Sequence, residues 1–279
     1  MSWPRYLVLL LLAAGAAHAE RGDYLLGGGL ESDSASGLRA AILASIGIAD
    51  DTWLGGSAST SKVDLPFGRR SDVVYADIDI DHHFDVLGFS IGAAYWGDPD
   101  LLHSADLRGS LYFKNDRVTL AAEYESRNFD FTIPATDLFA GREFAFDADG
   151  IGVRARFKLG AALSLGLSGM QYDYSVNFVP DENRDALRLV TVSRLGLLSN
   201  LVESRARIDF GLDAGQKRWE LDFSTWKAAL DRSRTRSITL RLLTPLSART
   251  DIEFGLGHDD SELYGNVTFF SVYLYGYGS

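Results

Sequence analysis

The 279-residue sequence has no cysteine, only 6 prolines, and no apolar run that reaches the roughly 20 residues a helix needs to cross a bilayer. Without cysteine, the chain can form neither a disulfide nor a thiolate metal site. Its 38 acidic residues outnumber 27 basic ones, and the net charge of −11 argues against general affinity for nucleic acid or an anionic membrane surface. The 28 glycines and 46% hydrophobic residues exclude a collagen-like and a disordered chain.

The N-terminal residues have the pattern of a secretory signal peptide. One basic residue, Arg5, precedes the apolar run Tyr6–Ala14, and a triplet with small residues at its first and third positions ends at Ala19. These are the three parts of a cleavable export signal. We expect residues 1–19 to be removed by cleavage after Ala19, which leaves residues 20–279 as the mature domain.

The mature chain alternates between apolar and polar residues over many short segments. Residues 74–81 read VYADIDID, and the same period of two recurs at residues 89–96, 107–114, 151–158, 163–168, 207–212, 220–223, 238–242 and 252–256. Successive side chains of a β-strand point to opposite faces. Each segment therefore predicts a strand with one apolar face and one polar, often charged, face.

Connectors of two lengths separate these predicted strands. The short connectors lie at residues 49–52, 84–86, 115–117, 160–162, 214–216 and 245–247. The longer, polar connectors lie at residues 31–37, 61–72, 98–104, 134–141, 228–235 and 259–266. Strands of about ten residues joined by alternately short and long connectors are typical of transmembrane β-barrels.

This pattern resembles the Gram-negative outer-membrane β-barrels, and the chain is similar in size to their small monomeric porin-like channels. The resemblance implies an all-β fold: a transmembrane antiparallel up-and-down β-barrel of about 14 strands, with 12 or 16 as alternatives. The count depends on residues 177–204, which contain either no spanning strand or two. Apolar residues with helical spacing favour a long loop folded over or into the pore rather than two irregular strands: Leu187, Val190, Leu197, Leu198 and Leu201.

A soluble periplasmic β-sandwich is the competing fold, because it has the same alternation with its apolar face turned inward. The export signal and the many hairpins of similar length favour the membrane, as do aromatic residues near strand ends: Trp53, Tyr95, Tyr124, Phe157 and Trp219. Alternating aromatics from Phe269 to Tyr277 resemble the last strand that the barrel assembly machinery reads. Gly278 and Ser279 follow, whereas that family usually ends on an aromatic residue.

The polar faces carry the candidate functional residues. On the predicted inner wall they form acidic and basic ladders: Asp77, Asp79, Asp81, Glu123, Glu125, Arg154, Arg156, Lys158, Arg207, Asp209, Glu220, Asp222, Arg241 and Glu253. Neighbouring strands set the Glu123 and Glu125 ladder against the ladder that begins at Arg154, which predicts cross-strand ion pairs. Such charges would select solutes, although any polar barrel wall also carries mixed charges for solvation alone.

The function that we predict is an outer-membrane porin-like channel that passes ions or small hydrophilic solutes through a charged lumen. One alternative is a plugged structural or secretion-partner barrel, because large side chains share the inner faces: Tyr75, Trp96, Tyr112, Tyr172, Tyr174 and Trp226. A second alternative is a hydrolase at the barrel rim.

Two histidine clusters bear on the hydrolase hypothesis. His258 stands next to Asp259, Asp260 and Ser261, where it could act as a general base. The sequence Asp81-His82-His83, followed by Asp85, resembles a metal site, but adjacent strand residues point to opposite faces and do not converge. We therefore predict no catalytic, cofactor-binding or metal residues.

The expected partners follow from the membrane location. They are outer-membrane lipid and lipopolysaccharide, with the barrel assembly machinery during biogenesis. We expect no binding of nucleic acid, since the chain has no basic stripe. No pattern marks an oligomer interface, so a monomer is the default.

Overall fold

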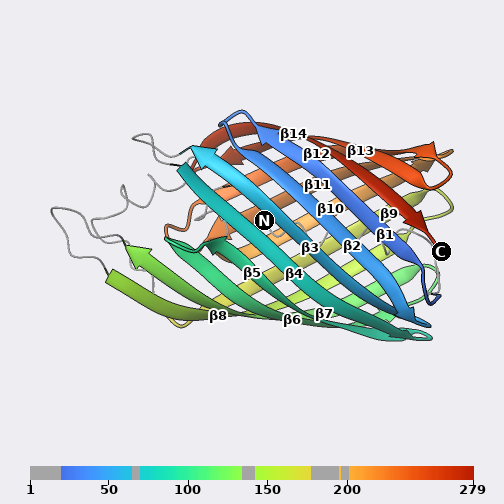
Figure 1. The fold of residues 1–279 in the computed structure, drawn as a ribbon, viewed down its shortest axis with the longest axis horizontal. Coiled ribbons are helices and arrows are strands. Elements are labelled where there is room, and N and C mark those ends of the chain that lie inside the picture. The colour runs from blue at the N-terminus through green and yellow to red at the C-terminus, as the bar shows by residue number, and fades with distance from the viewer. Residues whose placement is uncertain (1–19, 65–69, 134–141, 177–194, 196–200) are drawn as a thin grey trace.

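A computed structural model of the chain describes residues 20–64, 70–133, 142–176, 195 and 201–279. These residues form one closed antiparallel barrel of fourteen strands, as predicted (Figure 1). The strands are β1 (Tyr24–Asp33), β2 (Leu38–Ala49), β3 (Thr52–Asp64), β4 (Arg70–Phe84), β5 (Leu87–Asp98), β6 (Leu102–Lys114), β7 (Val118–Ile133), β8 (Arg142–Lys158), β9 (Leu163–Tyr174), β10 (Val202–Ala214), β11 (Lys217–Ala228), β12 (Arg234–Ser247), β13 (Thr250–Ser261) and β14 (Gly265–Gly278). The predicted signal peptide, residues 1–19, lies outside the described residues.

Hydrogen bonding between the first and last strands closes the barrel. β1 pairs with β14 in continuous register, from Tyr24 opposite Gly278 to Asp33 opposite Phe269. Each of the strands from β2 to β13 pairs with the strand before it and the strand after it. None of the fourteen described strands therefore has an unpaired edge, which is the condition for placing a β-sheet in lipid.

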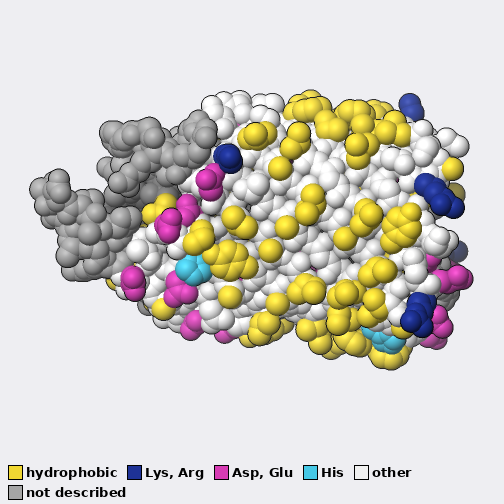
Figure 2. Space-filling model, in the orientation of Figure 1, with side chains coloured by type: hydrophobic (Ala, Val, Ile, Leu, Met, Phe, Trp, Pro, Cys, Tyr) yellow, Lys and Arg dark blue, Asp and Glu magenta, His cyan; other side chains and the backbone are white. Residues whose placement is uncertain are grey.

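The outer face of the barrel is apolar. Ile42, Leu111 and Ile151 are among its residues, with 66%, 71% and 72% of their surface exposed. Figure 2 shows one side of the barrel, where hydrophobic side chains cover the middle and charged ones lie toward the two ends. A soluble sandwich would bury this face, so the exposed apolar band identifies the fold as a membrane barrel. Among the described residues there is no helix long and apolar enough to cross a membrane.

Four of the five aromatic residues predicted at the membrane interface lie on the outer face. They are Tyr95, Tyr124, Phe157 and Trp219, and the last of these is 38% exposed. The fifth prediction, Trp53, is wrong. Trp53 shares its face of β3 with Gly55, whose Cα lies next to the inward carboxylate of Asp79. Alternation from Leu54, which pairs with Ile80 on the outer face, turns Trp53 inward.

One end of the barrel, here called the turn rim, carries the tight turns together with the start of β1 and the end of β14. Asp51, Asp85 and Gly215 have φ values of 57°, 51° and 65° in these turns. Tight hairpins require such left-handed residues because their twist must match that of the strands. The predicted connector at residues 245–247 is wrong, since β12 continues to Ser247 and turns at residues 248–249. Pro245 is tolerated there because it lies at a register irregularity.

The opposite end, the loop rim, carries the other connections. Several of them are shorter than the sequence predicts: β5 extends to Asp98 and β6 begins at Leu102, while β13 extends to Ser261 and β14 begins at Gly265. The strand ends there have polar residues on both faces, which gives them the composition of loops. The predicted helical segment falls largely on residues 177–194 and 196–200, outside the described residues, but its last member, Leu201, is buried.

Aromatic rings of the inner face lie over glycines of the neighbouring strand. On the β1–β14 seam, Tyr275 lies over Gly27, where an added Cβ would sit 2.8 Å from the ring, and Tyr273 lies over Gly29. Tyr172 lies over Gly150 of β8 in the same way. Because glycine has no side chain, each ring can lie close to the backbone of the wall.

The seam generates a first prediction. Gly29→Val should lower the free energy of unfolding by about 1–3 kcal/mol, since its side chain would overlap the Tyr273 ring and the carbonyl oxygen of Val272. Gly28→Val is the matched control, because Gly28 faces outward and its nearest atom to an added Cβ, the carbonyl oxygen of Ala41, is 3.4 Å away. Denaturant titration of the refolded barrel in lipid vesicles measures both. Equal stabilities of the two variants would contradict this role of the seam.

Candidate functional site

The inward faces of β4–β13 carry most of the charged side chains of the barrel, and we call this surface the charged wall. Thirteen of the fourteen residues predicted to line the lumen are buried or half-buried there. The exception is Lys158, which is exposed beside the β8–β9 turn. On β4 to β13 the alternation of the strands thus turns the charged set away from the apolar outer face.

The acidic ladder of β4 is held mainly by β6. Arg108 donates through Nη2 to the Tyr75 hydroxyl at 3.1 Å and lies 3.4 Å from Asp77 Oδ2. Asp77 also accepts a hydrogen bond from Ser57 of β3. Toward the turn rim, the Tyr112 hydroxyl donates to Asp81 at 2.8 Å.

The predicted contact between the ladders of β7 and β8 is present for one pair. Arg154 Nε lies 3.5 Å from Glu123 Oε1. Glu125, in contrast, reaches past β8 to the Tyr172 hydroxyl at 2.5 Å and to Arg205 of β10 at 3.2 Å. The register explains this difference, because Gly150 stands opposite Glu125 and the Tyr172 ring fills the space over that glycine.

A second network joins β8, β10, β11 and β12. Arg207 contacts Asp222, and it lies 3.0 Å from Glu220 and 3.7 Å from Asp209. Asp209 also receives Arg156, at 3.8 Å. Arg241 of β12 donates to the same Glu220 oxygen at 2.8 Å. Asp209 and Asp222 stand opposite each other in the register, so Arg207 offsets a repulsion between like charges.

The charged wall also contains residues that the sequence analysis did not single out, among them Asp106, Arg108, Arg127 and Arg205. Arg127 lies 3.4 Å from Asp106 and places its guanidinium 4.8 Å from the centre of the Phe129 ring. The sequence does contain the signal for them, because each of these residues alternates with outward residues on a strand that the period of two identifies. Arg127 continues the Glu123 and Glu125 ladder and Arg205 precedes Arg207, so these two ladders extend one position further than predicted.

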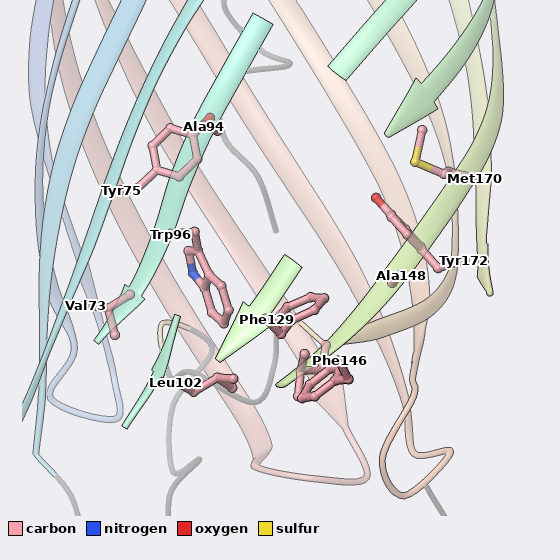
Figure 3. Packing of buried hydrophobic residues seen from close by; sticks show 11 residues of the cluster. Val73, Tyr75, Ala94, Trp96, Leu102, Phe129, Phe146, Ala148, Met170 and Tyr172 are labelled. Atoms are coloured by element: carbon pink, nitrogen blue, oxygen red, sulfur yellow. The ribbon is translucent and has the colours of Figure 1, made fainter. Parts of the chain in front are cut away.

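Toward the loop rim, the inner face of β4–β9 carries a cluster of buried hydrophobic residues (Figure 3). The buried residues of this loop-side cluster come from β4–β9 and from the start of the β10 region: Val73, Tyr75, Ala94, Trp96, Leu102, Phe129, Phe146, Ala148, Met170, Tyr172 and Leu201. Phe129 and Phe146 stack with their centres 4.8 Å apart. Three of the six large side chains predicted to obstruct the barrel belong to this cluster, and Tyr174 packs against it. Tyr112 and Trp226 are buried elsewhere on the inner face.

The two histidine clusters do not assemble into sites. His258 is exposed on the outer face and contacts Thr268 Oγ1 through Nδ1 at 3.1 Å, whereas Asp259 and Ser261 are buried on the inner face. His82 Nδ1 forms a hydrogen bond with the Thr52 hydroxyl, and the His83 ring stacks on Tyr112. Among the described residues, no group of three or more histidines and carboxylates is placed to hold a metal ion.

The closed barrel, its apolar outer band and its charged wall define a transmembrane β-barrel of the outer-membrane type. No family model matches the chain, and no curated protein matches it in sequence. Solved structures do share its fold. It is similar to the CymD monoaromatic hydrocarbon channel, with a TM-score of 0.60, 10% identity, and coverage of 93% of this chain and 89% of that one.

Two further barrels have the same fold. A TodX deletion mutant, also a monoaromatic hydrocarbon channel, gives a TM-score of 0.55 at 11% identity and covers 93% of this chain and 90% of its own. A loop-deletion mutant of OmpT, an outer-membrane protein of Vibrio cholerae, gives 0.51 at 10% identity and covers 92% and 98%. At these identities the likeness shows the fold alone.

The Arg207 network generates a second prediction. Arg207→Met should destabilise the barrel by about 3–5 kcal/mol, because it leaves the fully buried Asp222 without its counter-charge. Adding Asp222→Asn should recover part of that loss, and a double-mutant cycle on the free energy of unfolding measures the coupling. Lys217→Met, at the exposed β10–β11 turn, is the control and should change little. Additive effects of the first two substitutions would contradict the network.

Proposed function

We propose that the protein is an outer-membrane channel of a Gram-negative bacterium that passes ions or small hydrophilic solutes through the barrel. We propose further that it is exported by a signal peptide cleaved after Ala19. The observation that carries the channel proposal is the charged wall inside a closed barrel. In porins, a polar interior of this kind lines a water-filled channel.

The distribution of charge on the wall supports the same function. Carboxylates predominate on β4–β7, where Asp77, Glu123 and Glu125 lie. Arginines predominate on β8–β12, where Arg154 and Arg207 lie. In a ring of fourteen strands, β4 stands across the barrel from β11. The two sectors therefore set up a field across the lumen, and such a field orients and selects polar solutes.

The loop-side cluster favours a second candidate function, the passage of small apolar solutes. Two of the proteins that share the fold are described as monoaromatic hydrocarbon channels. The rings of Trp96, Phe129 and Phe146 would offer such solutes an apolar surface inside the barrel. Uptake of a radiolabelled aromatic hydrocarbon into vesicles, lost in Trp96→Ala and retained in Leu107→Ala on the outer face, would establish this candidate.

The channel proposal predicts conductance that is controlled from the inner face. Refolded protein in a planar bilayer should give single-channel steps. Because the chain has no cysteine, Ser168→Cys introduces one thiol on the charged wall, opposite Arg154 and Arg207 in the register. A charged, water-soluble thiol reagent should reduce the current of this variant.

Leu167→Cys is the matched control for this experiment, because Leu167 precedes Ser168 on β9 and faces outward with 39% of its surface exposed. Its current should not respond to the reagent. The absence of single-channel steps in the unsubstituted protein would overturn the channel proposal and favour the plugged barrel. An equal response of both variants would show that the current does not pass along the charged wall.

A further inference from the structure

We infer that the channel prefers cations and that Asp79 of β4 is the residue that sets this preference. The inference rests on the proposed channel function and adds to it a class of solute, namely small cations and solutes that carry a positive charge. Three observations support it: the partners of the β4 aspartates, the glycines beside Asp79, and the exposure of its carboxylate.

The three aspartates of the β4 ladder differ in their partners. Asp77 is paired with Arg108 and accepts a hydrogen bond from Ser57. Asp81 accepts a hydrogen bond from Tyr112. Asp79, between them, has no hydrogen bond or ion pair within the described part of the chain. It is thus the one aspartate of the ladder with neither a hydrogen bond nor an ion pair in the described part of the chain.

Glycines on both neighbouring strands explain why Asp79 is left alone. In the register, Gly55 of β3 and Gly92 of β5 stand on either side of it. The carboxylate lies over Gly55, where an added Cβ would be 2.8 Å from Oδ1. The next inward residue beyond Gly92 is Arg108, which turns instead to Tyr75 and Asp77.

A lone charge on the wall of a water-filled pore acts on the passing ions. It raises the local concentration of cations and lowers that of anions over about one Debye length, which is ~10 Å at 0.1 M salt. Paired charges contribute much less, since their fields largely cancel. Asp79 is half-buried and therefore reachable by water and ions.

Glu253 of β13 provides an internal comparison. It too has no ion pair within the described part of the chain, but it is only 8% exposed, and its neighbour Arg241 is engaged by Glu220. A carboxylate so deeply covered has little contact with the permeating solution. We therefore expect Glu253→Gln to shift the selectivity less than the corresponding change at Asp79.

Reversal potentials in a KCl gradient test the inference. The unsubstituted channel should favour K⁺ over Cl⁻, and Asp79→Asn should reduce the permeability ratio by about twofold or more at 0.1 M salt. The reduction should shrink at 1 M salt, where the Debye length is only ~3 Å. Asp79→Glu should keep the ratio of the unsubstituted protein, because it retains the charge.

Asp130→Asn is the matched control, since it removes one negative charge from the outer face, where Asp130 lies 3.5 Å from His103. Its permeability ratio should equal that of the unsubstituted protein. Single-channel steps with a ratio unchanged in Asp79→Asn would overturn the assignment of Asp79 while leaving the channel function intact. Anion preference in the unsubstituted protein would overturn the inferred solute class. Only the absence of any steps would count against the channel itself.

Discussion

Every peptide group that crosses lipid must find its hydrogen-bond partner within the protein, and this chain meets that requirement by closing β1 on β14. Closure fixes the rest of the architecture. Once the sheet has no edge, one face of each strand must meet lipid and the other the interior, so the alternating sequence becomes an apolar outside and a polar inside. The seam itself is built from side chains of unequal size, because Tyr273 and Tyr275 of the last strand lie over Gly29 and Gly27 of the first. Two strands far apart in sequence are thereby matched in shape as well as in register.

Glycine has a second effect on the inner wall, where it decides which charges meet. Gly150 has no side chain, so the Tyr172 ring lies over it and its hydroxyl meets Glu125. Glu125 also contacts Arg205, so one carboxylate joins strands that are not adjacent. Gly55 and Gly92 stand on either side of Asp79, so neither neighbouring strand places a side chain directly beside it. The same residue type therefore produces a dense network in one place and an isolated charge in another. The difference depends on where the side chain beyond the glycine is directed, because Arg108, beyond Gly92, turns to Tyr75 and Asp77.

The lengths of the connectors, together with the period of two, predicted the barrel and its strand number, and the period of two also placed most charged residues on one face of each strand. Alternation cannot predict which residues pair, since pairing depends on the register and on the strand beyond the neighbour. Glu123 and Arg154 were predictable from adjacent ladders, whereas the contact between Glu125 and Arg205 spans the two intervening strands β8 and β9. The strand ends at the loop rim were misjudged for a related reason. Outside the apolar band both faces of a strand are polar, so residues such as Asp98 and Asp259 have the composition of a loop while remaining in the sheet.

Two environments, one apolar and one charged, follow each other along the axis of the barrel interior. Near the loop rim, Trp96, Phe129 and Phe146 form an apolar surface on the β4–β9 side. Nearer the turn rim, Arg207 and its carboxylates form a network of largely buried ion pairs, in which each charge depends on its partners. Most charges of the network form ion pairs that join neighbouring strands. The net field that a solute meets is therefore set by the few groups that the pairing leaves out, and the positions of those groups follow from the glycines around them.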